Sequence, residues 1–176
     1  CDAIPTIAWL DGTSDGEADA DRLLDLMTAK GCAALNIIPD RNWNLKSPDE
    51  AATKQAKLAE IVAGCVARDL PVNIGTEMNK GGLPFVDDLA GPVLSRYASV
   101  FVQGMQIMVG QSVLARYADA PYLGARAVAE FPDRAQRNTF YAAVGALPAL
   151  TDQTAARLQD ASPDKAFSLL ADAVRN

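Results

Sequence analysis

PVNIGTEMNKGG, the sequence of residues 71–82, is a short apolar run that ends abruptly in glycine, polar and charged residues. This pattern predicts a buried parallel β-strand that opens into a loop, because near-continuous apolar runs are typical of strands covered on both faces. In barrels and doubly wound sheets, ligands bind at such strand ends. We therefore expect this loop to belong to the functional site.

Two similar apolar runs precede this strand, at residues 3–10 and 32–38, and each ends in a polar loop. Helical periodicity between the runs predicts helices at residues 18–30 and 48–68. The second helix begins with SPDE at residues 47–50, which is the pattern of a capping box with proline at the first helical position. Strand starts spaced by roughly 30 to 40 residues are typical of βαβ units.

Beyond residue 82 the pattern becomes mainly helical. The expected helices are at residues 93–98, 100–117, 132–146, 151–158 and 163–174. A strand at residues 107–109 is an alternative within the second of these. We predict an α/β fold, in which a partial (β/α) barrel with parallel strands spans residues 1–118. A helical C-terminal segment, residues 119–176, packs on it within a single domain.

Three parallel strands alone leave two exposed sheet edges. The chain also begins at Cys1 and runs almost at once into a strand. We therefore expect a piece of a longer protein, with the sheet completed either by a missing N-terminal half or by another copy of the chain in a homo-oligomer.

Bulk composition limits the classes of partner. The net charge is −6, and no basic stripe with interleaved aromatic residues is present, which argues against nucleic-acid binding. No apolar run reaches about 18 residues, so we expect no membrane span. The three cysteines lack metal-binding spacing, and buried thiols in a reducing compartment predict a cytoplasmic protein.

The chain contains no histidine. This excludes Ser-His-Asp and Cys-His nucleophile systems within the chain and removes the commonest zinc ligand. The glycines also form neither a G-x-G-x-x-G pattern nor a P-loop, so no nucleotide-binding fingerprint is present.

The loops that begin at Asp11, Pro39 and Gly75 are expected to converge, because the carboxyl ends of parallel strands lie on one edge of a sheet. Their chemically active side chains are those of Asp11, Asp15, Asp40, Arg41, Asn42, Asn44, Glu77, Asn79 and Lys80. From these we take Glu77 and Asp40 as the candidate catalytic residues. The candidate substrate-binding residues are Arg41, Asn42, Asn79, Lys80 and Asp11.

A carboxylate at Glu77 can act as a general base or as a metal ligand, and the alternative is a solvated or capping glutamate. Arg41 can bind a carboxylate or phosphate through two hydrogen bonds, or it can pair with Asp40 to stabilise the loop. Lys80 can orient an anion or form a Schiff base, although a lysine beside two glycines is often simply exposed.

Three neighbouring positions have similar alternatives. Asp11 can serve the site or form an Asx turn with Gly12. Trp43 can stack on a ligand or cover the core. The pair Asp87-Asp88 can bind a divalent cation or cap a following helix.

Three strings resemble one protein family: ALNIIPDRNWN at residues 34–44, NIGTEMN at residues 73–79 and PFVDD at residues 84–88. Together they resemble the C-terminal half of uncharacterised bacterial proteins related to metal-dependent hydrolases of the polymerase-and-histidinol-phosphatase (PHP) type. The resemblance covers roughly residues 3–118.

This resemblance implies a distorted barrel with its site at the strand carboxyl ends. It also implies divalent metals bound by His, Asp and Glu, and hydrolysis of a phosphoester or amide-like bond by a metal-activated water. Because the chain has no histidine, either its ligands lie in a missing N-terminal half or the metal has been lost. Asp40, Glu77 and Asn79 can supply oxygen ligands to Mg²⁺ or Mn²⁺, Zn²⁺ is a third candidate, and the ligand set stays unassigned.

We therefore expect a metal-dependent hydrolase that acts on a small polar or anionic substrate. One alternative is a non-catalytic binding or assembly module derived from a barrel enzyme, which the lack of histidine favours. Another is a lyase or aldolase that uses Lys80.

Overall fold

The computed structural model of the protein describes residues 2–78, 81–83 and 85–175. The chain divides into two compact units. Residues 5–102 form the first, called here the α/β unit, and residues 1–4 with 103–176 form the second, called the helical unit. Each unit has its own hydrophobic core.

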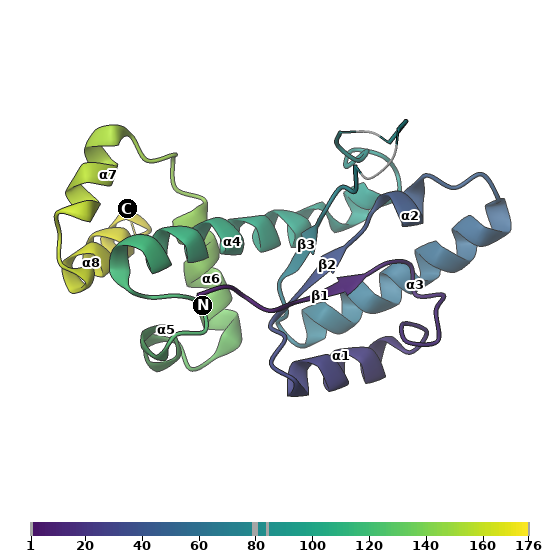
Figure 1. Cartoon of the computed structure of the whole chain (residues 1–176), viewed down its shortest axis with the longest axis horizontal. Helices are drawn as coiled ribbons and strands as arrows, with labels where there is room; N and C mark the ends of the chain where they lie inside the picture. The colour runs from purple at the N-terminus through teal and green to yellow at the C-terminus, as the bar shows by residue number, and fades with distance from the viewer. Residues whose placement is uncertain (1, 79–80, 84, 176) are drawn as a thin grey trace. The chain divides into compact units, whose positions relative to one another are not determined.

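The α/β unit is built on a three-stranded parallel sheet in the order β1-β2-β3 (Figure 1). The strands are β1 (Thr6–Trp9), β2 (Ala34–Ile37) and β3 (Val72–Ile74). Trp9 pairs with Ile37, and Ile37 pairs with Ile74, so the three strands end level with one another. The loops that follow them therefore leave from a single edge of the sheet.

All three predicted strands form and are parallel, but the prediction of a partial (β/α) barrel is wrong. The described part of the chain contains these three strands and no others, and the elements after β3 are helical. A barrel of this type closes about eight strands that tilt and stagger around an axis. The alternation of strands and helices that suggested a barrel is equally typical of an open α/β sheet.

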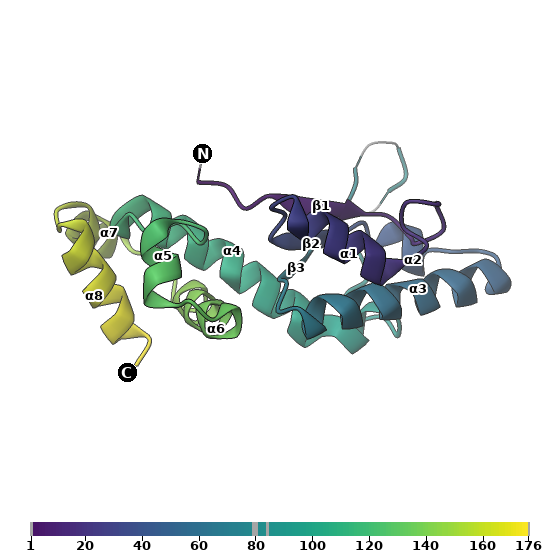
Figure 2. The ribbon, with the colours of Figure 1, turned by 90° about the horizontal axis from the view of Figure 1, so that it is seen from below.

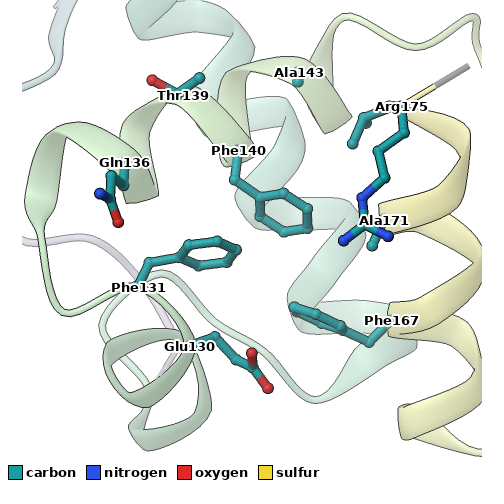
Figure 3. Close-up of a pocket in the computed structure, with 10 residues that line it drawn as sticks. Glu130, Phe131, Gln136, Thr139, Phe140, Ala143, Phe167, Ala171 and Arg175 are labelled. Atoms are coloured by element: carbon teal, nitrogen blue, oxygen red, sulfur yellow. The ribbon is translucent and has the colours of Figure 1, made fainter.

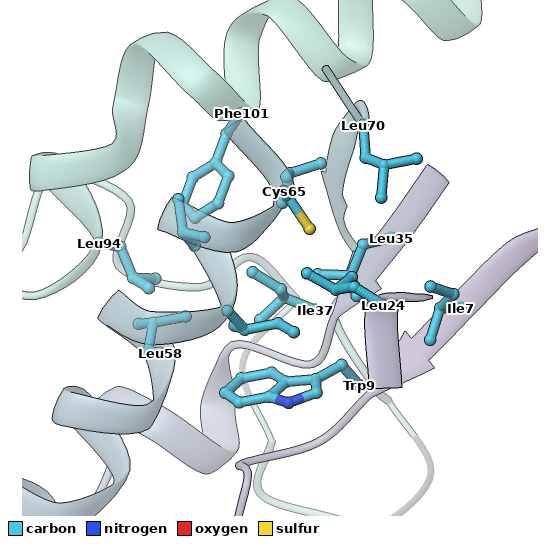
Figure 4. Packing of buried hydrophobic residues seen from close by; sticks show 13 residues of the cluster. Ile7, Trp9, Leu24, Leu35, Ile37, Leu58, Cys65, Leu70, Leu94 and Phe101 are labelled. Atoms are coloured by element: carbon cyan, nitrogen blue, oxygen red, sulfur yellow. The ribbon is translucent and has the colours of Figure 1, made fainter. Parts of the chain in front are cut away.

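Two helices, α1 (Ala20–Ala29) and α3 (Pro48–Ala67), cover one face of the sheet (Figures 1 and 2). The core between them is formed by buried residues that include Ile7, Trp9, Leu24, Leu35, Ile37, Leu58, Ile61, Cys65 and Val72 (Figure 4). Successive strand side chains point to opposite faces, so the other face carries Thr6, Ala8, Asn36 and Asn73. Thr6 and Ala8 are exposed, which shows that β1 is covered on one face rather than on both.

Helix α3 begins at Pro48, as predicted, and α1 begins at Ala20, two residues after its predicted start. The Asp19 side chain accepts a hydrogen bond from the Arg22 backbone N–H at 3.0 Å, and Ser47 does the same for Glu50 at 3.4 Å. The Glu50 carboxylate, expected to complete a capping box, instead pairs with Lys54 at 2.7 Å. The Glu50 side chain therefore contacts a residue one helical turn further along α3 instead of the backbone at the start of the helix.

The remaining helices are mostly those expected from the sequence. They are η1 (Leu94–Tyr97), α4 (Ala98–Ala118), α5 (Ala125–Glu130), α6 (Arg134–Gly145), α7 (Asp152–Gln159) and α8 (Pro163–Ala173). The alternative of a strand at residues 107–109 is wrong, because these residues lie inside α4. The short helix α5 was not predicted, and its N-cap, Gly124, makes no side-chain capping bond.

Close helix packing shapes the core of the helical unit. Tyr122 and Tyr141 meet edge to face with ring centroids 5.1 Å apart, and the Tyr141 hydroxyl donates to the Ala120 carbonyl at 2.8 Å. Gly110 of α4 and Gly145 of α6 lie where the two helix backbones touch. A Cβ atom on either glycine would overlap a carbonyl oxygen of the other helix.

One of the described helical segments, Leu94–Ala118, is long and apolar enough to cross a membrane, with a mean hydropathy of 1.2 over an 18-residue window. It is weak evidence for a membrane span, because core helices of soluble proteins meet the same criterion. Of the 18-residue window, 33% is buried, and the segment contributes Leu94 and Phe101 to the core of the α/β unit and Ile107 and Leu114 to the core of the helical unit.

Candidate functional site

Two side chains tie the three loops at the carboxyl edge of the sheet together: Asn42 joins the first loop to the second, and Asp87 joins the second to the third. We call this region the strand-end site. It comprises the loop after β1, the short helix α2 (Asp40–Trp43) after β2, and residues 75–78 after β3. The helix α2 occupies a segment for which the sequence predicted a loop. Asn79 and Lys80, two of the predicted binding residues, lie outside the described residues.

Asp11 follows β1 and is nearly buried, with 8% of its surface exposed. Its carboxylate lies 3.1 Å from Nζ of Lys54 and accepts hydrogen bonds from the hydroxyl and backbone N–H of Thr13. The bond to the N–H two residues on is an Asx turn, and Gly12 within it has a φ of 74°. The structural alternative considered for Asp11 is therefore present in the fold.

The surroundings of Asp11 and Lys54 keep both groups charged. Burial is the largest influence on Asp11 and raises its pKa, but hydrogen bonds from Thr13 and Lys54 outweigh burial and lower the pKa below 3.8. The hydrogen bond to Glu50, followed by the one to Asp11, raises the pKa of Lys54 above 10.5. Lys54 was not a sequence candidate, although its spacing of four residues from Glu50 on one helix was a visible signal.

Glu17 holds the backbone of the first loop. Its carboxylate accepts hydrogen bonds from the N–H groups of Leu10, Asp11 and Gly12 at 2.8, 3.3 and 3.1 Å. A carboxylate that accepts several backbone hydrogen bonds fixes the loop around it. No local sequence pattern indicates this role, because it depends on how the loop folds back.

Asn42 joins the first and second loops from a fully buried position. Its Nδ2 donates to the carbonyls of Leu10 at 2.8 Å and Ile38 at 3.1 Å. Its Oδ1 has no hydrogen-bond partner among the residues that the structure describes. Asn42 was a candidate for substrate binding, but this position makes it part of the support beneath the site.

Asp87 joins the second and third loops. Its Oδ1 accepts a hydrogen bond from Nε1 of Trp43 at 2.7 Å, and its Oδ2 accepts one from the Thr76 hydroxyl at 2.6 Å. Asp87 is 4% exposed, and Trp43 is half-buried against the core of the α/β unit. Trp43 therefore covers the core and anchors α2 at the same time.

Arg41 and Glu77 are two charged groups of the site that remain partly accessible. Nη2 of Arg41 lies 3.9 Å from Oε2 of Glu77, and 45% and 33% of the two side chains are exposed. This separation allows electrostatic attraction but is too long for a hydrogen bond. Asp40, the other predicted catalytic residue, accepts a hydrogen bond from Asn44 at 2.8 Å, and no bond between Asp40 and Arg41 is present in the described residues.

Asn79, one of the three predicted oxygen ligands, lies outside the described residues, so the structure describes the predicted metal site only at Asp40 and Glu77. The described residues contain no group of three or more Cys, Asp or Glu side chains that could hold a metal ion. Zinc sites use three or four protein ligands, more than Asp40 and Glu77 supply, whereas Mg²⁺ is commonly bound through one or two carboxylates together with waters and substrate phosphates.

A separate pocket lies in the helical unit, between α5, α6 and α8 (Figure 3). It has a volume of about 570 Å³, and the rings of Phe131, Phe140 and Phe167 line it. Phe131 and Phe140 stack with centroids 4.6 Å apart. None of the residues predicted for the site lines this pocket.

Comparison of the chain with protein-family models, with curated proteins and with solved structures found no match. The assignment of function therefore depends on the geometry of the strand-end site.

Proposed function

We propose that the strand-end site binds a small polar or anionic molecule and that the protein hydrolyses it. The observation that carries this proposal is the Arg41–Glu77 pair, which places a guanidinium and a carboxylate 3.9 Å apart at the accessible edge of a parallel sheet. This edge is where open α/β proteins generally bind ligands.

The contrast with the other charged groups supports the choice of this pair. Asp11 and Asp87 are buried and bonded to neighbouring loops, and Lys54 is held between two carboxylates. These groups stabilise the loops. Arg41 and Glu77 are both open to solvent and can therefore meet a ligand directly.

Each member of the pair has a distinct task in this proposal. The guanidinium of Arg41 binds the anionic group of the substrate, because its planar donors match a phosphate or carboxylate. The carboxylate of Glu77 acts as a general base and takes a proton from a water molecule as the water oxygen bonds to the phosphorus or carbonyl carbon of the substrate. The bond to the leaving group breaks, and the leaving oxygen or nitrogen takes up the proton from Glu77. Removal of such a base typically slows catalysis by about 10²- to 10⁴-fold.

The metal that the family resemblance implies enters no step of this proposal, because the described side chains do not form a metal-binding set. The same observation favours the second candidate function, a binding module without catalysis. In that case Arg41 and Glu77 bind the ligand, and no bond is broken.

A lysine-dependent lyase is the third candidate. Its expected nucleophile, Lys80, lies outside the described residues. Lys54 is unsuited to the role, because Glu50 and Asp11 raise its pKa and keep the amine protonated. Borohydride trapping in the presence of a carbonyl substrate tests this reaction, and a trapped adduct at Lys80 would favour it over hydrolysis.

The decisive experiment measures binding and turnover separately. Inorganic phosphate binding is followed by calorimetry, and hydrolysis of p-nitrophenyl phosphate and p-nitrophenyl acetate is followed by absorbance, with the metal content of the purified protein measured in parallel. We expect Glu77→Gln to bind phosphate a few-fold more tightly than the wild type and to lose hydrolysis. Glu60→Gln, at an exposed position of α3, is the matched control.

Phosphate binding without hydrolysis in the wild-type protein would support the binding module. If the wild-type protein neither binds phosphate nor hydrolyses either ester, the proposal is wrong. A cytoplasmic location belongs to the same proposal and is supported by Cys32 and Cys65, which are free thiols, as is usual in a reducing compartment.

A further inference from the structure

We infer that Asp87 is the positioning residue of the strand-end site and sets the separation of Arg41 and Glu77. This inference rests on the proposed function, because it assigns to Asp87 the task of holding the ligand-binding pair. Asp87 lies after the third loop and was considered from sequence as a cation ligand or a helix cap.

The two oxygens of one carboxylate hold the two segments that carry the pair. Oδ1 of Asp87 accepts from Trp43, two residues after Arg41, and Oδ2 accepts from Thr76, the residue before Glu77. The spacing between the two bonds is fixed by the geometry of a single carboxylate. Asp87 therefore fixes the position of α2 relative to the loop after β3.

The segment that carries Arg41 is held by Asn42 as well as by Asp87. The segment that carries Glu77 is held by the bond from the Gly75 N–H to the Ile37 carbonyl at 3.0 Å as well as by Asp87. Asn42 binds the carbonyls of Leu10 and Ile38 and so fixes α2 to the strand ends. Because Arg41 directly precedes Asn42 and the anchored Trp43, its backbone is restrained on its C-terminal side. Loss of Asp87 would release the link between these restraints and Thr76.

Burial gives Asp87 an indirect role. With 4% of its surface exposed, its carboxylate is shielded from solvent, whereas Arg41 and Glu77 are open. Buried polar groups that are fully hydrogen-bonded tend to hold a single arrangement of their surroundings. An amide could make both bonds, because its oxygen can accept from Trp43 and its nitrogen can donate to the Thr76 hydroxyl.

This difference between substitutions gives a sharp test. Asp87→Ala removes both bonds, Asp87→Asn retains both, and Thr76→Val removes one with little change in volume. The exposed neighbour Asp88→Ala is the matched control. Crystal structures of the variants give the Arg41–Glu77 separation, calorimetry gives the Kd for inorganic phosphate, and thermal unfolding shows that each variant is folded.

We expect Asp87→Ala to widen the Arg41–Glu77 pair beyond ion-pairing range and to weaken phosphate binding by about 10-fold or more, because a misplaced guanidinium loses a charge-assisted hydrogen bond to the phosphate. Asp87→Asn should restore both the separation and the Kd to near wild-type values, and Thr76→Val should fall between. If Asp87→Ala does not fold, the Arg41–Glu77 separation and the Kd of Thr76→Val are the test of the inference.

The inference is overturned if the Arg41–Glu77 separation is unchanged in Asp87→Ala. If Asp87→Ala does not fold, an unchanged separation in Thr76→Val overturns it. A separation in Asp87→Asn that differs from the wild-type value also overturns it. The separation is measured without a ligand. Absence of phosphate binding in the wild-type protein therefore overturns the proposed function, while the structures still decide the role of Asp87.

Discussion

Nζ of Lys54, on α3, lies 3.1 Å from Oδ2 of Asp11, at the end of β1, and both side chains are largely buried. The contact joins the first strand-end loop to a helix that covers the sheet. Removal of one partner would leave the other as a buried charge with fewer bonds. The stability of this pair should therefore depend on pH in a defined way.

We predict that Lys54→Met destabilises the fold by about 1–3 kcal/mol at pH 7, less than the full cost for a deeply buried pair, because Thr13 still bonds Asp11. The folded-state pKa of Asp11 is lowered, so its contribution to stability is present above pH 3.8 and is lost as the pH falls through the folded-state value. The raised pKa of Lys54 makes its contribution present below pH 10.5 and lost at higher pH.

Urea unfolding between pH 3 and pH 9 measures this effect. The difference between the wild type and Lys54→Met should be largest near neutral pH and should shrink toward pH 3. Lys46→Met changes an exposed lysine in the loop before α3 and serves as the control. A difference that is constant across the acid range would contradict the assigned contact.

A second prediction concerns the buried amide of Asn42. Asn42→Leu keeps the size of the side chain but removes both donors to the carbonyls of Leu10 and Ile38. Each unsatisfied buried carbonyl costs about 1–3 kcal/mol, so we expect a loss of about 2–4 kcal/mol in the free energy of unfolding.

Asn44→Leu, at an exposed position at the end of α2, should cost far less. Chemical denaturation of the two variants gives the comparison. Equal losses for Asn42→Leu and Asn44→Leu would show that the two buried hydrogen bonds do not support the site.

A third prediction tests the contact between α4 and α6. Alanine at Gly110 or Gly145 would place a Cβ against the backbone of the other helix, where no flexible side chain can move aside. We expect either substitution to destabilise the helical unit by at least about 1–3 kcal/mol, the usual cost of overpacking.

The control for this contact is Gly16→Ala, because a Cβ at Gly16 meets nothing within 4 Å. Thermal unfolding followed by circular dichroism compares the three variants. A melting temperature for Gly110→Ala equal to that of Gly16→Ala would contradict the close approach of the helices.

Local patterns predicted the strands and the long helices, but they could not predict how many strands the sheet has or whether it closes into a barrel. Apolar runs and helical periodicity identify β1, β2, β3 and α3, because those signals lie within a few residues of each other. The number of strands in a sheet is not a local property. The alternation of elements is shared by barrels and open sheets, and it could not distinguish between them.

The sequence predicted where the candidate site lies, but it predicted the roles of only some of the residues there. The sequence placed Arg41 and Glu77 near one edge, and the structure brings them together. It could not show that Asp87 binds Trp43, because these residues are 44 positions apart and neither is unusual in its local sequence. Burial also separates Asn42 from its exposed neighbour Arg41, a distinction that required the short helix α2 to be seen.

The last prediction uses the opposite charges of Arg41 and Glu77. If the site binds anions, Arg41→Gln should weaken inorganic phosphate binding by about 10-fold or more, because a charge-assisted hydrogen bond is worth about 1.5–3 kcal/mol. Glu77→Gln should have the opposite effect and strengthen phosphate binding by a few-fold, because the carboxylate 3.9 Å from the guanidinium competes with the ligand and repels it.

Both effects should diminish as the salt concentration rises, since the two groups are accessible to solvent and are screened. Calorimetric titrations at low and physiological ionic strength measure the two Kd values, with Arg22→Gln on α1 as the control for a lost surface charge. Weaker phosphate binding in Glu77→Gln would show instead that Glu77 orients Arg41. The anion would then have to bind Arg41 while the contact between Arg41 and Glu77 stays in place.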